Sequence, residues 1–152
     1  MLVLKKFNVW RYLISAVAVA VLAQFIYAGI DPLLSMDYYL NPQYKFLWNK
    51  LMMPSLGQEP TATFMYLSVL FTLITTLLFA GFYTIVKKAI PGKCLTCKGL
   101  SYGLMMFVVA GIPGYLMMGL LFEMPVGLLL LWAAEDFVIK VLGGLIIADI
   151  NQ

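Results

Sequence analysis

The sequence predicts an all-α fold: an integral membrane four-helix bundle with a short interfacial amphipathic helix between the first two spans. Composition is the first observation, because 63% of the 152 residues are hydrophobic and only 11% are charged, against about 25% charged in soluble domains. The second observation is that apolar runs recur at about residues 11–30, 62–86, 102–122 and 126–147. Each run is close to the roughly 20 residues that cross a bilayer. We therefore expect one transmembrane domain over residues 1–152.

The first expected span, residues 11–30, begins directly after a basic segment that contains Lys5 and Lys6. Its apolar run is long and lacks a clear small-residue cleavage site, so we expect a retained helix and not a cleaved signal. Gln24 is a polar residue inside this span, and we expect it to form a hydrogen bond to a neighbouring helix.

A polar segment, residues 31–60, separates the first two spans. Residues 42–53 within it are flanked by residues that commonly start and end a helix. Asn41 can cap the helix, Pro42 suits its first position and Pro54 stops it. Apolar side chains recur at i, i+3, i+4 and i+7, at Tyr44, Leu47, Trp48 and Leu51. This spacing predicts an amphipathic helix in the membrane interface. A short re-entrant or lid segment is the alternative.

The third span, residues 102–122, differs from the second, residues 62–86, in having a break near its centre. Proline removes a backbone hydrogen bond, so we expect a kink or a local break there. A neighbouring polar group or water must then satisfy the freed carbonyl. The residues proposed to line a cavity or gate at this level are Gly111, Pro113, Gly114, Gln24 and Tyr115.

The fourth span, residues 126–147, carries Glu135, Asp136 and Lys140 about half way along. Each charge at the centre of a spanning helix costs about 2.5–3.5 kcal/mol, so three cost roughly 8–10 kcal/mol. Asp136 and Lys140 are four residues apart and can pair on one face. Glu135 points about 100° away, so it must stay protonated, reach another helix or face water. These three residues are the candidate ion or polar site; an ion pair that only locks the bundle or an oligomer is the alternative.

Cys94 and Cys97 form a CxxC pair in a short basic loop ahead of the third span. Flanking Lys93 and Lys98 would stabilise a thiolate, so redox exchange or metal capture is chemically possible. Membrane thiol oxidoreductases of the quinone-linked kind need a second cysteine pair, which this chain lacks. Two reduced loop thiols are the alternative, because the expected compartment is reducing.

The absence of histidine excludes several classes of chemistry. It removes the usual haem ligand, the commonest zinc ligand and the usual general base. We therefore expect no catalytic residues and no cofactor, and an enzyme is the less favoured class. The net charge of +3 is small and spread along the chain, so we expect no nucleic-acid binding. The expected partners are the lipid bilayer and either further copies of this chain or another membrane protein.

The distribution of basic residues predicts a multi-pass protein of the cell membrane with both termini in the cytoplasm, because Lys and Arg collect on that side. Only Lys45 and Lys50 lie on the opposite side, and the residues on the terminal side are Lys5, Lys6, Arg11, Lys87, Lys88, Lys93 and Lys98.

The intramembrane acids favour a small proton or ion transporter, or a channel-like protein, because ionisable residues inside a membrane usually serve function. A non-catalytic accessory or scaffold subunit of a larger membrane complex is the first alternative. Thiol or metal handling through Cys94 and Cys97 is the second.

Overall fold

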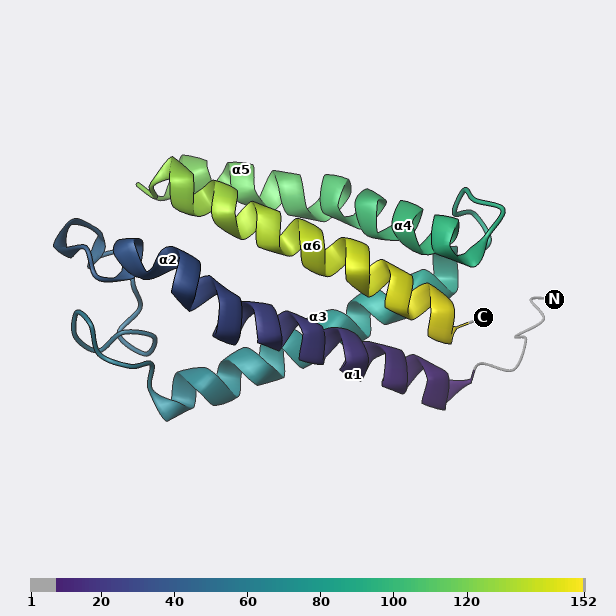
Figure 1. Ribbon diagram of the computed structural model, residues 1–152, viewed down its shortest axis with the longest axis horizontal. Helices are drawn as coiled ribbons and strands as arrows, with labels where there is room; N and C mark the ends of the chain where they lie inside the picture. Colours follow the sequence, from purple (N-terminus) through teal and green to yellow (C-terminus); the bar gives the residue numbers. More distant parts are fainter. Residues whose placement is uncertain (1–7, 152) are drawn as a thin grey trace.

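The computed structural model describes residues 8–151 and contains helices but no strand among them. Four long helical rods run roughly along one axis (Figure 1). The predicted all-α four-helix fold is therefore confirmed. The elements in chain order are α1 (Val9–Phe25), η1 (Ile26–Ile30), α2 (Asp31–Tyr39), η2 (Pro42–Tyr44), α3 (Ala62–Val86), α4 (Leu95–Met106), η3 (Phe107–Gly111), α5 (Ile112–Leu121) and α6 (Val126–Ile150).

The first rod is longer than the expected span of residues 11–30, because the chain stays helical through α2 to Tyr39. The sequence Asp31-Pro32 looked like the end of a helix, since proline cannot donate to the carbonyl four residues back and its ring crowds that carbonyl. The π-turn η1 resolves this conflict by adding one residue to the turn. The Asp31 amide then donates to the Ile26 carbonyl five residues back. Pro32 follows directly, at a position where the helix does not need a backbone amide donor.

The third rod is built in the same way. The π-turn η3 ends where the Ile112 amide donates to the Phe107 carbonyl, and Pro113 follows directly. The expected local break in this helix is therefore present, in the form of a π-turn. The rod starts earlier than residue 102, because Cys94 caps α4 and Cys97 lies in its first turn. The cysteine pair thus belongs to a helix start and not to a loop ahead of the helix.

The second rod, α3, has the predicted bounds of residues 62–86. The Thr61 hydroxyl caps its start by accepting the Phe64 amide at 3.2 Å. The fourth rod, α6, also starts as predicted and extends to Ile150, three residues beyond the expected end.

The expected amphipathic helix over residues 42–53 is wrong in its extent. It starts as predicted, with Asn41 capping and Pro42 leading, but only the three residues of η2 are helical and turns follow. Asn49 directs these turns: its side chain accepts the Leu51 amide, and its carbonyl accepts the next two amides, all at 2.9 Å. Burial of Trp48 among side chains of α2 and α6 favours this compact shape.

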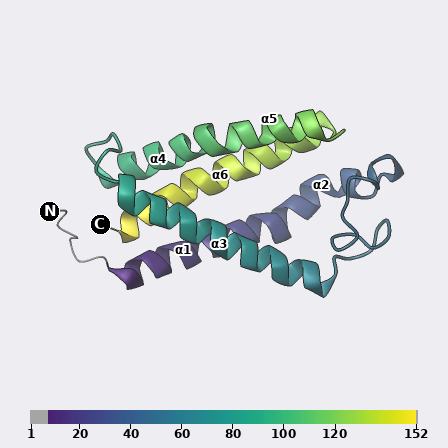
Figure 2. The same ribbon diagram turned by 180° about the vertical axis from the view of Figure 1, so that it is seen from behind.

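That buried cluster closes one end of the bundle. The Trp48 ring packs edge-on against Tyr39, with centroids 4.8 Å apart, and lies 6.2 Å from the ring of Trp132. Leu128 completes the cluster and is fully buried. Both loops at this end, residues 40–61 and 122–125, lie opposite the start of α1 and the end of α6 (Figures 1 and 2). The end with the start of α1 and the end of α6 is called the terminal end below.

The half of the bundle nearer the terminal end is filled by the main hydrophobic core. Its buried members come from all four rods: Ala16, Val19, Phe79, Ala80, Tyr83, Tyr102, Ile147 and Ala148, with Ile90 from the loop after α3. The Tyr102 ring stacks on Phe79, and its hydroxyl donates to the Phe79 carbonyl. Packed side chains therefore fill most of this half of the bundle.

Helices α4 and α6 lie side by side (Figures 1 and 2), and glycines set their separation. A Cβ at Gly103 would lie 2.3 Å from the Lys140 carbonyl oxygen, and one at Gly144 would lie 2.4 Å from the Gly99 carbonyl oxygen. Gly99 and Gly103 are four residues apart, the small-xxx-small spacing that lets membrane helices approach closely. This close approach fixes the position of Lys140 relative to α4.

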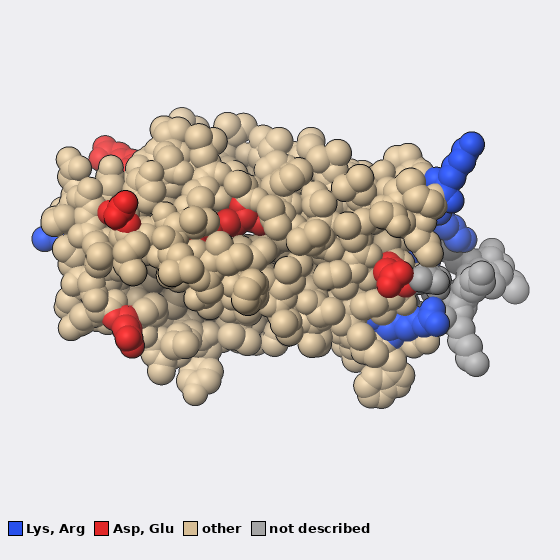
Figure 3. Space-filling model, in the orientation of Figure 1, with Lys and Arg blue, Asp and Glu red and all other residues tan. Residues whose placement is uncertain are grey.

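Three rods are long and apolar enough to cross a membrane: Val9–Tyr39, Ala62–Val86 and Leu95–Leu121. They indicate a small multi-span membrane protein in contact with lipid. Charged side chains gather toward the two ends of the molecule, with a largely uncharged belt between them (Figure 3). Helix α6 is as long as α3 but carries three central charges, and its crossing of the membrane stays a prediction.

Candidate functional site

Helix α6 presents its three central charged residues, Glu135, Asp136 and Lys140, to the interior of the bundle. The Lys140 ammonium donates to the Asp136 carboxylate, which forms the i, i+4 ion pair that the spacing predicts. The Asp136 side chain is 11% exposed and that of Lys140 is 19% exposed. Figure 3 shows acidic atoms in the middle of the otherwise uncharged face. The two residues therefore satisfy each other in a largely buried position.

Glu135 lies beside this pair in sequence but has a different environment. Its side chain is only 6% exposed, and neither carboxylate oxygen has a hydrogen-bond partner among the described residues. Lys140 cannot serve both acids, because Glu135 points about 100° away around the helix. Another acid, Asp31, acts electrostatically on Glu135. An ionised Glu135 would thus be a buried charge without a donor, the most costly state for a carboxyl group.

Asp31 is a site residue that the sequence reading missed. It is the first residue of α2 and is 8% exposed. Its carboxylate accepts hydrogen bonds from the Ser35 hydroxyl at 2.6 Å, from the Trp132 indole at 3.0 Å and from the Tyr39 hydroxyl. The bond to Trp132 joins the first rod to α6, so Asp31 is held by donors that compensate for its burial.

A sequence signal for Asp31 was available. Ser35 and Tyr39 follow it at i+4 and i+8, so both donors lie on the same helical face as the acid. That pattern becomes visible only if the helix is allowed to continue through Pro32, and the proline argued for a boundary. Trp132 could not have been inferred as a partner, because it is 101 residues away in sequence.

Two tyrosines connect the acids of the two rods. Tyr27 interacts electrostatically with acids of both rods, Asp31, Glu135 and Asp136. Tyr115 interacts electrostatically with Glu135 and Asp136, and its hydroxyl donates to the Trp132 carbonyl at 3.1 Å. Of the expected cavity residues, Tyr115 is therefore brought to the site.

Only some of the other expected cavity residues lie at the site. Gly111 is buried beside the ion pair, since a Cβ there would lie 2.9 Å from an Asp136 carboxylate oxygen. Pro113 is exposed, and a Cβ at Gly114 would meet nothing within 4 Å, so both face away from the site. Gln24 forms its expected interhelical bond, donating to the Thr72 hydroxyl at 2.8 Å.

Two open cavities reach these polar groups. One, of about 880 Å³, lies against α3 and is lined by Tyr27, Asp136 and Lys140 together with several hydroxyl residues of α3. The other, of about 520 Å³, is lined by Gln24, Tyr27 and Asp31 and by the loop between η2 and α3. Tyr27 borders both cavities. The polar groups are thus approachable from the loop end and from the side of α3.

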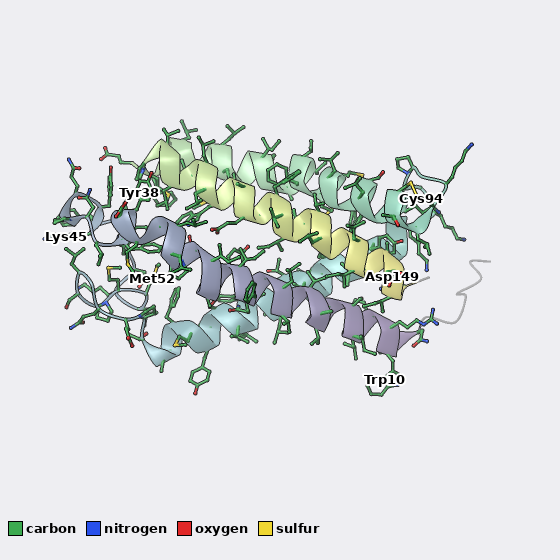
Figure 4. All side chains as sticks on the ribbon, viewed as in Figure 1. Trp10, Tyr38, Lys45, Met52, Cys94 and Asp149 are labelled. Atoms are coloured by element: carbon green, nitrogen blue, oxygen red, sulfur yellow. A yellow bond between two sulfur atoms is a disulfide. The ribbon has the colours of Figure 1, made fainter. Side chains whose placement is uncertain are left out.

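Cys94 and Cys97 are joined by a disulfide at the start of α4. Cys94 lies at the opposite end of the bundle from the loops 40–61 and 122–125, on the same side as Asp149 of α6 (Figure 4), so the disulfide is a separate feature from the buried acids. Within the part of the chain that the structure describes, no three acidic or cysteine residues gather in a way that could hold a metal ion. No family model, no curated protein and no solved structure matches this chain.

Proposed function

We propose that the chain moves protons across the membrane through an intramembrane acidic site, with Glu135 as the group that takes up and releases the proton. The observation that carries this proposal is the lack of any hydrogen-bond partner for the Glu135 carboxylate oxygens among the described residues. Asp31 has three donors and Asp136 has Lys140, so neither needs a proton to be stable. Glu135 is the acid left to bind one.

The position of the acids supports one-sided access. The Asp31 network and Glu135 occupy the half of the bundle nearer the loops, because Trp132 and Glu135 lie only roughly 9 and 14 Å along α6 from its start. The terminal half is filled by the core around Tyr102. In this proposal a proton enters from the loop end, where Tyr27 and Asp31 line an open cavity, and passes on to the buried Glu135. Its release on the other side requires the core to rearrange. This arrangement fits alternating access better than an open pore.

An accessory or scaffold role is the second candidate, and helix α5 favours it. None of the residues of α5 is buried against the rest of the described chain. Its surface is free for lipid, for a second copy of the chain or for another membrane subunit. In that role the acids serve assembly, and the isolated protein would show no proton flux above that of empty vesicles.

The test is proton flux in proteoliposomes that contain a pH-sensitive dye, driven by a potassium diffusion potential. The wild-type protein should acidify or alkalinise the lumen according to the sign of the potential. Glu135→Gln should lower the rate by at least about tenfold, because the amide cannot exchange a proton at the same place. Glu123→Gln is the matched control, since Glu123 is exposed in the loop before α6.

Both variants should insert and assemble like the wild type, checked by detergent extraction and size-exclusion chromatography. Unchanged flux in Glu135→Gln, with intact insertion, contradicts the assignment of Glu135. Absence of flux in the wild type contradicts proton transport and favours the accessory role.

A further inference from the structure

The disulfide at the start of α4 is accessible from outside the bundle. Cys94 caps the helix and Cys97 lies in its first turn, and both residues are exposed. In Figure 4 Cys94 lies at the end of the bundle, at the start of α4. The two cysteines are therefore at the surface of the described chain, at the start of the candidate span Leu95–Leu121.

The bridge contributes little to holding the fold together. It joins residues only three apart in sequence, and so closes a very short loop. The stabilisation that a disulfide gives by restricting the unfolded chain grows with the length of the closed loop. The two residues are also already held in one turn by the Lys98 amide, which donates to the Cys94 carbonyl at 3.0 Å. Stabilisation of the fold is therefore a weak explanation for two cysteines at this position.

The surroundings of Cys94 favour thiolate chemistry. Its sulfur atom accepts the Cys97 amide at 3.0 Å, one of the unpaired donors at the start of α4. In the reduced chain the same amide, the helix dipole and the flanking Lys93 and Lys98 stabilise a negative charge on that sulfur.

Gly92 brings the preceding loop against the helix start. It has φ +138°, a conformation that favours glycine, and a Cβ there would lie 3.0 Å from both the Cys97 Cβ and the Lys98 amide nitrogen. The loop therefore holds Cys97 within reach of Cys94, as a resolving thiol requires.

We propose that Cys94 and Cys97 are a reversible dithiol–disulfide pair through which the chain exchanges two electrons with a thiol–disulfide partner at this end of the bundle. In the oxidising direction the Cys94 thiolate attacks one sulfur of the partner's disulfide, and the other sulfur leaves as a thiolate. The Cys97 thiolate then attacks the Cys94 sulfur, which forms the internal disulfide and releases the second partner thiol. The chain loses two electrons and two protons, and the partner gains them as two thiols.

The first experiment uses the purified full chain in detergent with mixtures of reduced and oxidised glutathione as the probe. The thiols are then blocked with a polyethylene-glycol maleimide and separated on a gel. The pair should open and close as a two-thiol unit as the glutathione ratio changes. A pair that stays reduced, or stays oxidised, at every ratio contradicts the proposal.

The second experiment separates the two cysteines. Cys97→Ala should trap a single glutathione adduct on Cys94, and its thiol should react with iodoacetamide at neutral pH about threefold faster than the Cys97 thiol of Cys94→Ala. Equal rates at the level of free glutathione contradict the assignment of Cys94 as the attacking residue.

A double variant with both cysteines replaced by alanine distinguishes redox exchange from a structural staple. It should unfold at the same temperature as the wild type and keep its proton flux, whereas Glu135→Gln should keep its thiol exchange. A clear fall in the unfolding temperature of the double variant contradicts the redox proposal and assigns the bridge to stability.

Discussion

At the scale of single residues, the three buried acids of the chain differ in how they are satisfied. Asp31 accepts from three donors, Asp136 pairs with Lys140, and Glu135 has no partner among the described residues. Buried carboxylates are stable only when donors or opposite charges compensate for lost water. The site therefore contains two acids with partners and one acid, Glu135, for which no donor is present among the described residues.

The first prediction at this scale concerns the donors around Asp31. Asp31→Asn should lower the free energy of unfolding by about 1–3 kcal/mol, because the amide nitrogen meets donors where the second carboxylate oxygen accepted hydrogen bonds. Unfolding in a denaturing detergent titration, followed by tryptophan fluorescence, measures the change, since Trp132 contacts Asp31 directly.

Asp37→Asn is the matched control for Asp31→Asn. Asp37 lies in the same helix but is exposed, so its substitution should stay within about 0.5 kcal/mol of the wild type. Equal losses in the two variants would show that the Asp31 network does not stabilise the contact between α2 and α6.

At the scale of elements, the close contact of α4 and α6 positions the ion pair. Gly103→Ala should lower the free energy of unfolding by about 1–3 kcal/mol, because its Cβ would lie 2.3 Å from the Lys140 carbonyl oxygen and only a shift of helix backbone can relieve the overlap. The same titration measures it. Gly114→Ala is the control and should be neutral or stabilising by up to about 1 kcal/mol, since its Cβ meets nothing within 4 Å. The prediction fails if Gly103→Ala is as well tolerated as Gly114→Ala.

The elements also show which features of the fold could be predicted from sequence. The bounds of α3 agree with prediction because Thr61 and Lys87 flank an uninterrupted apolar run. The start of α6 agrees for a similar reason, since Pro125 directly precedes its first residue. Strong local signals of this kind predict a helix boundary without knowledge of tertiary contacts.

The structure differs from the sequence-based expectations where contacts between distant residues, or an irregular helical turn, determine the local conformation. The expected interfacial helix gives way to turns because Trp48 gains more from the cluster with Tyr39 and Leu128 than from lying on a surface. Asp31 was assigned to a loop because the proline rule is valid for regular helices and η1 is not regular. For the site, the Asp136–Lys140 pair follows from spacing, whereas the environment of Glu135 depends on which residues of other rods surround it.

At the scale of the whole molecule, the ends differ in charge. Five basic residues of the described chain lie at or near the terminal end, and two lie in the opposite loop: Arg11, Lys87, Lys88, Lys93 and Lys98 against Lys45 and Lys50. Lys5 and Lys6, which contributed to the predicted orientation, lie outside the described residues. The cytoplasmic placement of both termini stays a prediction.

Cysteine labelling in intact cells tests this orientation. In a chain without Cys94 and Cys97, a cysteine introduced as Ser55→Cys should react with a membrane-impermeant maleimide from outside, because Ser55 lies exposed in the loop opposite the terminal end. The Cys97 thiol of Cys94→Ala should react only after lysis, because positive charges keep that end inside. A permeant maleimide should label both chains. The reverse pattern would place the termini outside.

The two π-turns determine which residues of the first and third rods face the interior of the bundle. Each residue of an α-helix advances about 100° around the axis, so a turn that absorbs one extra residue rotates everything beyond it by that angle. Without the insertion in η1, the Asp31 carboxylate would be turned away from Trp132. A one-residue insertion or deletion upstream of Asp31 would therefore disturb the site more than most substitutions, although the hydropathy of the span would hardly change.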